Sequence, residues 1–76
     1  MARAINPAAL RDMRRLVGIS QQELGRRAGL HPNSVSNIEG GKHPVTPETQ
    51  RALANALGVT LDAITIPVPE PIQAAS

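Results

Sequence analysis

The feature that most constrains this chain is residues 20–42, which read as two short helices joined by a tight turn. Ser20 is a suitable N-cap residue, and Glu23 three positions later completes the sequence pattern of a capping box. Gly29 supplies the left-handed conformation that ends a helix sharply. Pro32 can start the next helix, because the missing N–H of proline costs nothing there. The pattern predicts helices over residues 21–28 and 32–39.

The polar face of the second helix differs from an ordinary solvated face. It carries short, mostly uncharged side chains that donate and accept hydrogen bonds: His31, Asn33, Ser34, Ser36 and Asn37. A face that meets only water is more often rich in Glu and Lys, because these residues favour a helix and Asn and Ser do not. Base-pair edges in a major groove offer a matching pattern of donors and acceptors. We therefore expect this face to contact double-stranded DNA.

The segment resembles the helix-turn-helix of the phage repressor and Cro family, also called the xenobiotic-response-element type. The resemblance rests on Gly25, where the family usually has Ala, on the turn residue Gly29 and on a further set of positions: Val35, Ile38, Glu39, Gly41 and Lys42. Residues 53–64, LANALGVTLDAI, also resemble the closing helices of the family. The resemblance covers residues 7–65 and implies a sequence-specific transcriptional regulator, of phage or prophage type, that needs no cofactor.

The resemblance also implies roles for individual residues. Gln21 is expected to hold a phosphate and to brace the second helix. The alternative is that Gln21 is only an exposed residue at the start of its helix. Phosphate contacts are expected for Ser34 and Lys42, and base contacts for three others, since Asn bonds bidentately to adenine: Asn33, Ser36 and Asn37. His31 precedes the helix and would either cap it or approach a phosphate. A buried ion pair between Arg14 and Glu39 is expected to orient the second helix.

The remaining pattern completes an all-α, five-helix fold of the lambda-repressor type. Asn6 and Pro7 open a helix that Gly18 closes after Val17, with Leu10, Met13 and Val17 as its buried stripe. Thr46 and Pro47 open a fourth helix that ends at Gly58, and Thr60 caps a short fifth helix over residues 61–65. In residues 66–76, proline occupies every second position from Pro67 to Pro71, which predicts an extended or polyproline II tail. The domain is therefore expected to span residues 1–65.

Composition narrows the function classes further. The 76 residues contain no Cys, so no disulfide or thiolate metal site is possible, and a reducing cytoplasm fits. The chain also lacks Phe, Tyr and Trp, which argues against modules that stack single-stranded bases on aromatic platforms. His31 and His43 without clustered acids are a weak basis for a metal site. No apolar run is long enough for a membrane helix, and no catalytic constellation is evident.

One DNA-binding domain of this size reads about half of a typical operator, so a weak symmetric homodimer is expected. The apolar residues expected to form the contact are Leu61, Ile64, Ile66 and Val68. Two other readings stay open: an antitoxin that binds a toxin through its tail, and a protein-interaction module that has lost DNA binding.

Overall fold

Four α-helices form where a capping residue precedes an apolar stripe, as the sequence predicts. The computed structural model describes residues 2–42 and 44–68. Within them the helices are α1 Pro7–Val17, α2 Gln21–Ala28, α3 Pro32–Glu39 and α4 Pro47–Leu57. At each start a side chain accepts a first-turn N–H, and the four capping residues are Asn6, Ser20, His31 and Thr46. Left-handed glycines, Gly18, Gly29 and Gly58, end α1, α2 and α4.

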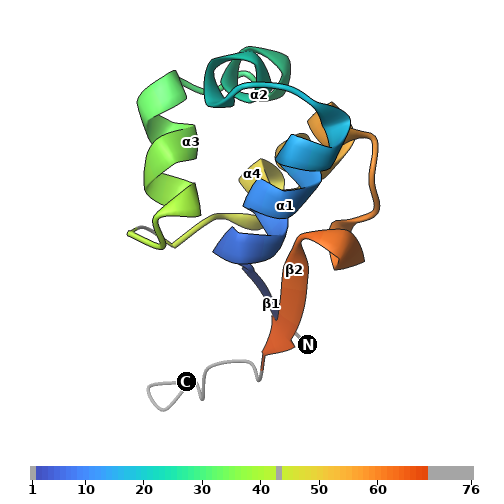
Figure 1. Cartoon of the computed structure of the whole chain (residues 1–76). Helices are drawn as coiled ribbons and strands as arrows, with labels where there is room; N and C mark the ends of the chain where they lie inside the picture. Colours follow the sequence, from blue (N-terminus) through green and yellow to red (C-terminus); the bar gives the residue numbers. More distant parts are fainter. Residues whose placement is uncertain (1, 43, 69–76) are drawn as a thin grey trace.

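The core lies where the four helices and the segment after α4 meet. Its fully buried side chains come from every helix and from that segment, and they are Leu10, Leu24, Val35, Leu53 and Ile64. In Figure 1, α3 stands on one flank, α2 crosses above α1, and α4 lies behind. Val17, expected in the buried stripe of α1, is 42% exposed because it is the last helical residue and the chain turns away at Gly18.

The fold is not all-α, because residues near the two chain ends form an antiparallel sheet. β1 spans Ala2–Ile5 and β2 spans Thr65–Val68. The register pairs Ala4 with Ile66 and Ile5 with Thr65. Figure 1 shows the two strands side by side as a ribbon that projects below the helices. β1 is not among the elements expected from the sequence, because four residues are too few for an alternating pattern to be recognised.

The fifth helix expected over residues 61–65 is a single 3₁₀ turn, η1, Leu61–Ala63. Thr65 and Ile66 are β-branched, and Ile66 precedes a proline, so both conditions favour extended backbone. The N-terminal strand then supplies a partner: Asn6 N–H donates to the carbonyl oxygen of Ile64 at 2.8 Å. Strand pairing therefore replaces the last turn of the expected helix.

The two-stranded ribbon changes the expected domain boundary and the expected dimer contact. The boundary between residues 65 and 66 falls inside β2, so residues 66–68 belong to the folded unit. Ile64 is fully buried in the core and Leu61 packs against the core, so neither presents the free apolar surface that was expected. Ile66 is 46% exposed and Val68 is half-buried. Residues 69–76 of the expected tail lie outside the described residues.

The helices of the described residues are also short. No helix in residues 2–42 and 44–68 has the length and apolar character needed to cross a membrane.

Candidate nucleic-acid interface

The turn between α2 and α3 is tight because a glycine lies beneath it. Leu30 N–H donates to the carbonyl oxygen of Gly25 at 2.7 Å, which pulls the turn onto α2. A Cβ at Gly25 would lie 2.8 Å from the backbone oxygen of Leu30 and 3.4 Å from a methyl group of Val35. Gly29 contributes the left-handed backbone of the turn, with φ 73°. Gly25 thus allows a closer approach of the turn than any side chain would.

Only half of the expected capping box forms at the start of α2. Glu23 N–H donates to the hydroxyl oxygen of Ser20 at 3.0 Å. The carboxylate of Glu23, however, accepts hydrogen bonds from Arg26 and Arg27, with shortest distances of 2.7 and 2.8 Å. Charge-assisted bonds one turn along the helix are stronger than a bond to a neutral N–H, which explains the preference. The two arginines and Glu23 therefore form an ion-pair cluster at the surface of α2.

A buried polar network fixes α3 against α1 and α2. Arg14 Nε donates to Glu39 Oε2 at 2.6 Å, and Arg14 Nη2 donates to Glu39 Oε1 at 3.1 Å. Gln21 Nε2 also donates to Glu39 Oε1, at 3.0 Å, and the remaining guanidinium nitrogen of Arg14 donates to the Ile19 carbonyl oxygen at 3.0 Å. The ion pair expected from the sequence is therefore present and is bidentate.

The electrostatics of this network keep the carboxylate ionised. Burial raises the pKa of Glu39, but hydrogen bonds from Arg14 and Gln21 outweigh it and hold that pKa below its ordinary value. The hydrogen bond with Glu39 in turn raises the pKa of Arg14. Gln21 thus braces α3, one of the two roles expected of it.

With one side of α3 held in this way, its opposite side is left open. Val35, Ile38 and Glu39 are buried, whereas Asn33 and Ser36 are exposed. Ser34 and Asn37 are half-buried along one flank of this open side. The outward side of α3 therefore carries amide and hydroxyl side chains, with no charged one among its described residues. Such a surface suits the recognition of hydrogen-bond donors and acceptors on base edges.

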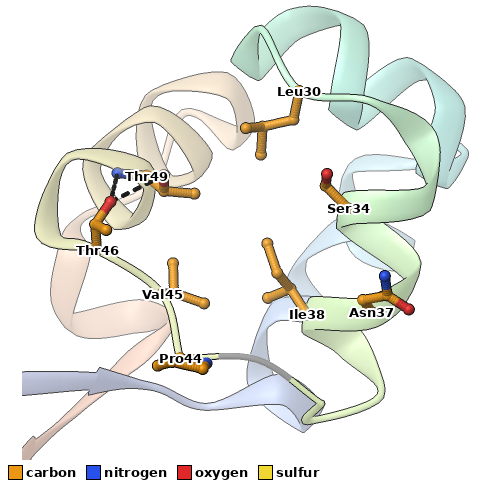
Figure 2. Close-up of a pocket in the computed structure, with 8 residues that line it drawn as sticks. All are labelled: Leu30, Ser34, Asn37, Ile38, Pro44, Val45, Thr46 and Thr49. Carbon is orange, nitrogen blue, oxygen red and sulfur yellow. Dashed lines mark hydrogen bonds between the residues drawn. The ribbon is translucent and has the colours of Figure 1, made fainter.

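A groove of about 280 Å³ runs along the flank of α3 that carries Ser34. Figure 2 shows Ser34 and Ile38 facing Val45 and Thr49 across it. Its surface is more apolar than polar and includes hydroxyl and amide side chains; the full lining is Leu30, Ser34, Asn37, Ile38, Pro44, Val45, Thr46 and Thr49. The surface therefore presents a ridge, α3, beside a hollow, with the start of α4 as the second ridge.

Sequence reasoning missed the far wall of this groove. Thr46 was expected only as a helix cap, and it does accept the N–H of Thr49 at 3.2 Å. No local pattern indicates that this cap faces α3 across a hollow, because the separation of the two helices depends on how both pack on the core. The Thr46-Pro47 pair predicts where α4 begins, but it does not indicate that Thr46 lines a groove beside α3.

The residues at the two ends of α3 complete the site. Lys42 is exposed just after the helix, and its backbone N–H donates to the carbonyl oxygen of Asn37 at 3.0 Å. Gly41 adopts φ 71° between them, so the chain folds back at this point. His31 is exposed at the start of α3 and caps it. His43 lies outside the described residues, and no three metal-binding side chains gather in residues 2–42 and 44–68.

A family model described as a helix-turn-helix domain matches residues 8–64. The chain is similar to the restriction-modification controller protein C.AhdI from Aeromonas hydrophila, at 30% identity and a TM-score of 0.74 over 75% of this chain and 83% of that chain. It is also similar to the clp gene regulator ClgR from Corynebacterium glutamicum, at 31% identity and a TM-score of 0.71 over 75% of each chain.

A third similar structure is the DNA-binding domain of the P22 C2 repressor, at 27% identity and a TM-score of 0.71 over 74% of each chain. Comparison with curated protein sequences returned no match. All three similar structures align with most of the chain, so the likeness extends beyond the two helices that carry the sequence motif.

Proposed function

This chain belongs to the helix-turn-helix domain family, and from that premise we propose that it regulates transcription by binding specific sequences in double-stranded DNA. The observation that carries the proposal is the uncharged polar face of α3, held in place by the Arg14–Glu39–Gln21 network. An α-helix, about 10–12 Å across with side chains, fills a major groove about 12 Å wide. α3 would therefore enter the groove and present Asn33, Ser36 and Asn37 to base edges.

The surface beside α3 supports the same docking. Once α3 fills the major groove, the neighbouring sugar-phosphate strand has to lie against whatever flanks the helix. The groove between α3 and the start of α4 is the concave surface there, and its lining includes the hydroxyl groups of Ser34 and Thr49, whereas the Thr46 hydroxyl already donates to Thr49. Gln21 and Lys42 would add phosphate contacts at the start of α2 and the end of α3. The ridge and hollow of the protein are thus complementary to the groove and strand of DNA.

The experiment that tests this function is selection of bound duplexes from a random pool, followed by titration of two variants. Asn37→Ala should weaken binding to the selected duplex by about 1–3 kcal/mol and leave a random duplex nearly unaffected. Lys42→Ala should weaken binding to both and reduce the salt slope by about one unit. Asn55→Ala and Arg15→Ala are matched controls, because both residues are exposed on other helices. A pool that yields no enriched sequence contradicts the proposal.

Two alternatives, an antitoxin and a protein-interaction module without DNA binding, have less support from the structure. The antitoxin reading rested on the proline-rich tail, but residues 66–68 are paired in β2 and the remainder lies outside the described residues. A protein-interaction module without DNA binding would show no steep loss of duplex affinity with salt, so the same titration separates it from a regulator.

A homodimer is proposed through the outward face of the β1–β2 ribbon. Ala4 and Ile66 are paired in register and lie on one face, with Val68 two residues along, whereas Ile5 and Thr65 occupy the face toward the core. Few side chains contribute, so the contact is far smaller than the ~800 Å² per partner of a stable interface. The dimer is therefore expected to form on a palindromic operator rather than free in solution.

A second copy is not expected to pair as an added strand at the edges of the ribbon, so the outward face is the proposed contact. Asn6 N–H donates to the carbonyl oxygen of Ile64, and hydrogen-bonded positions alternate along an antiparallel strand. The backbone N–H and C=O of Arg3, three residues before Asn6, therefore point away from β2. The carbonyl oxygen of Arg3 is already bonded by Gln50 Nε2 at 3.0 Å. Opposite Arg3, Pro67 has no N–H to offer. Cooperative binding to a full palindrome, compared with one half-site, tests whether two copies associate on DNA.

A further inference from the structure

The first turn of α3 has no spare backbone N–H in the part of the chain described. Pro32 has none by its chemistry. Asn33 N–H donates to the ring nitrogen Nδ1 of His31 at 3.1 Å, and Ser34 N–H donates to the His31 carbonyl oxygen at 2.9 Å. Val35 N–H donates to the same oxygen at 3.4 Å. Any hydrogen bond that this end of α3 gives to another molecule must therefore come from a side chain.

Beside the side chains of Asn33 and Ser34, the cap leaves His31 with a donor of its own at this end. An imidazole nitrogen that accepts a hydrogen bond carries no proton, so in the neutral ring the proton lies on the other nitrogen, Nε2. Nε2 is separated from Nδ1 by one ring carbon, and its N–H points in a largely opposite direction to the Nδ1 lone pair that accepts the Asn33 N–H. His31 is exposed, as is Asn33 on the outward side of α3. The cap thus leaves His31 with one free polar atom, which can only donate.

Within residues 2–42 and 44–68, the only hydrogen bond of the His31 ring is the cap itself, so no side chain there accepts from Nε2. Glu23 on α2 is occupied by Arg26 and Arg27, and Glu39, at the far end of α3, is occupied by Arg14 and Gln21. We propose that His31 donates a hydrogen bond from Nε2 to an acceptor atom of the bound duplex, with its tautomer set by the α3 cap. The inference rests on the proposed DNA-binding function, and the acceptor is either a phosphate oxygen or a purine N7 or O6 on a base edge.

Two methylated histidines at position 31 separate the two roles of the ring. A chain of 76 residues is within reach of chemical synthesis, so this 76-residue chain can carry Nε2-methylhistidine or Nδ1-methylhistidine there. The Nε2-methyl ring keeps the cap and loses the donor, so we expect an unchanged melting temperature and about 10-fold weaker duplex binding. The Nδ1-methyl ring loses the cap, and in its neutral form Nε2 carries no proton, so the donor is lost as well; we expect weaker duplex binding together with a melting temperature lower by about 4–8 °C.

The probes are the duplex recovered by selection and a random duplex of equal length. A loss on both assigns the acceptor to a phosphate, and a loss on the selected duplex alone assigns it to a base edge. In the unmodified protein, nitrogen-15 spectra should show Nε2 protonated and Nδ1 bare, and the Nε2–H signal should shift when duplex is added. Equal affinity of the Nε2-methyl and unmodified proteins for both duplexes overturns the inference. If the unmodified protein binds neither duplex, the proposed function itself fails.

Discussion

The prediction that best tests the architecture concerns the ion pair between α1 and α3. Arg14→Met leaves the carboxylate of Glu39 buried, at 8% exposure, with Gln21 as its remaining hydrogen-bond donor in the network. Glu39→Leu leaves the guanidinium of Arg14 with only the Ile19 carbonyl oxygen from that network. Removing one partner of a buried pair costs about 3–5 kcal/mol. A domain of this size has a total stability of only about 4–11 kcal/mol, so either single variant should lose a large part of it.

The double variant should be more stable than either single one. Met and Leu fill a similar volume and bury no charge, and such replacements of buried ion pairs are often close to neutral. A coupling free energy of at least about 2 kcal/mol is therefore expected from the double-mutant cycle. Urea unfolding followed by far-ultraviolet circular dichroism is the suitable assay, because the chain has no aromatic residue to report by fluorescence.

Arg26→Met provides the matched control for this cycle. It breaks an ion pair at a side chain that is 75% exposed, so a loss of no more than about 1 kcal/mol is expected. A cycle with coupling near zero, or single variants no worse than this control, would refute the claim that the pair acts as a buried unit.

Three other outcomes are expected. Gly25→Ala should destabilise the domain, because a Cβ 2.8 Å from a backbone oxygen causes an overpacking cost of about 1–3 kcal/mol that exceeds the ~1 kcal/mol gain in helix propensity; a higher melting temperature than wild type would contradict this. Burial raises the pKa of Glu39, but the hydrogen bonds from Arg14 and Gln21 hold that pKa below its ordinary value of 4.5. The carboxylate therefore stabilises the fold fully above pH 4.5, and this stabilisation is lost as the pH falls through the lower pKa of the folded state. Glu39→Gln should therefore unfold with a flatter pH dependence in acid, and an unchanged slope would exclude this residue as a source. Ile66→Asp should abolish cooperative binding to a palindrome while a half-site is bound as before; retained cooperativity would remove the ribbon face from the contact.

The sequence determined the local structure well, because the signals for caps and turns are short-range. Asn6, Ser20 and Thr46 mark the starts of helices, and glycines mark their ends, since each needs only its own neighbours to make the hydrogen bond or adopt the dihedral angle. The resemblance to a known family added the pairing of Arg14 with Glu39, which no local rule provides.

Only the tertiary structure decided the features that depend on residues far apart in the chain. β2 replaces the end of a helix because β1, more than fifty residues earlier, offers it a partner. That pairing buries Ile64 and leaves Ile66 at the surface, a division that alternating apolar residues alone could not assign to one face or the other. The groove beside α3 likewise exists only because Leu30, Ile38 and Val45 are brought together by packing of separate helices on a shared core. Local hydrogen bonds are encoded within a few residues, whereas the distance between two surfaces is set by everything packed beneath them.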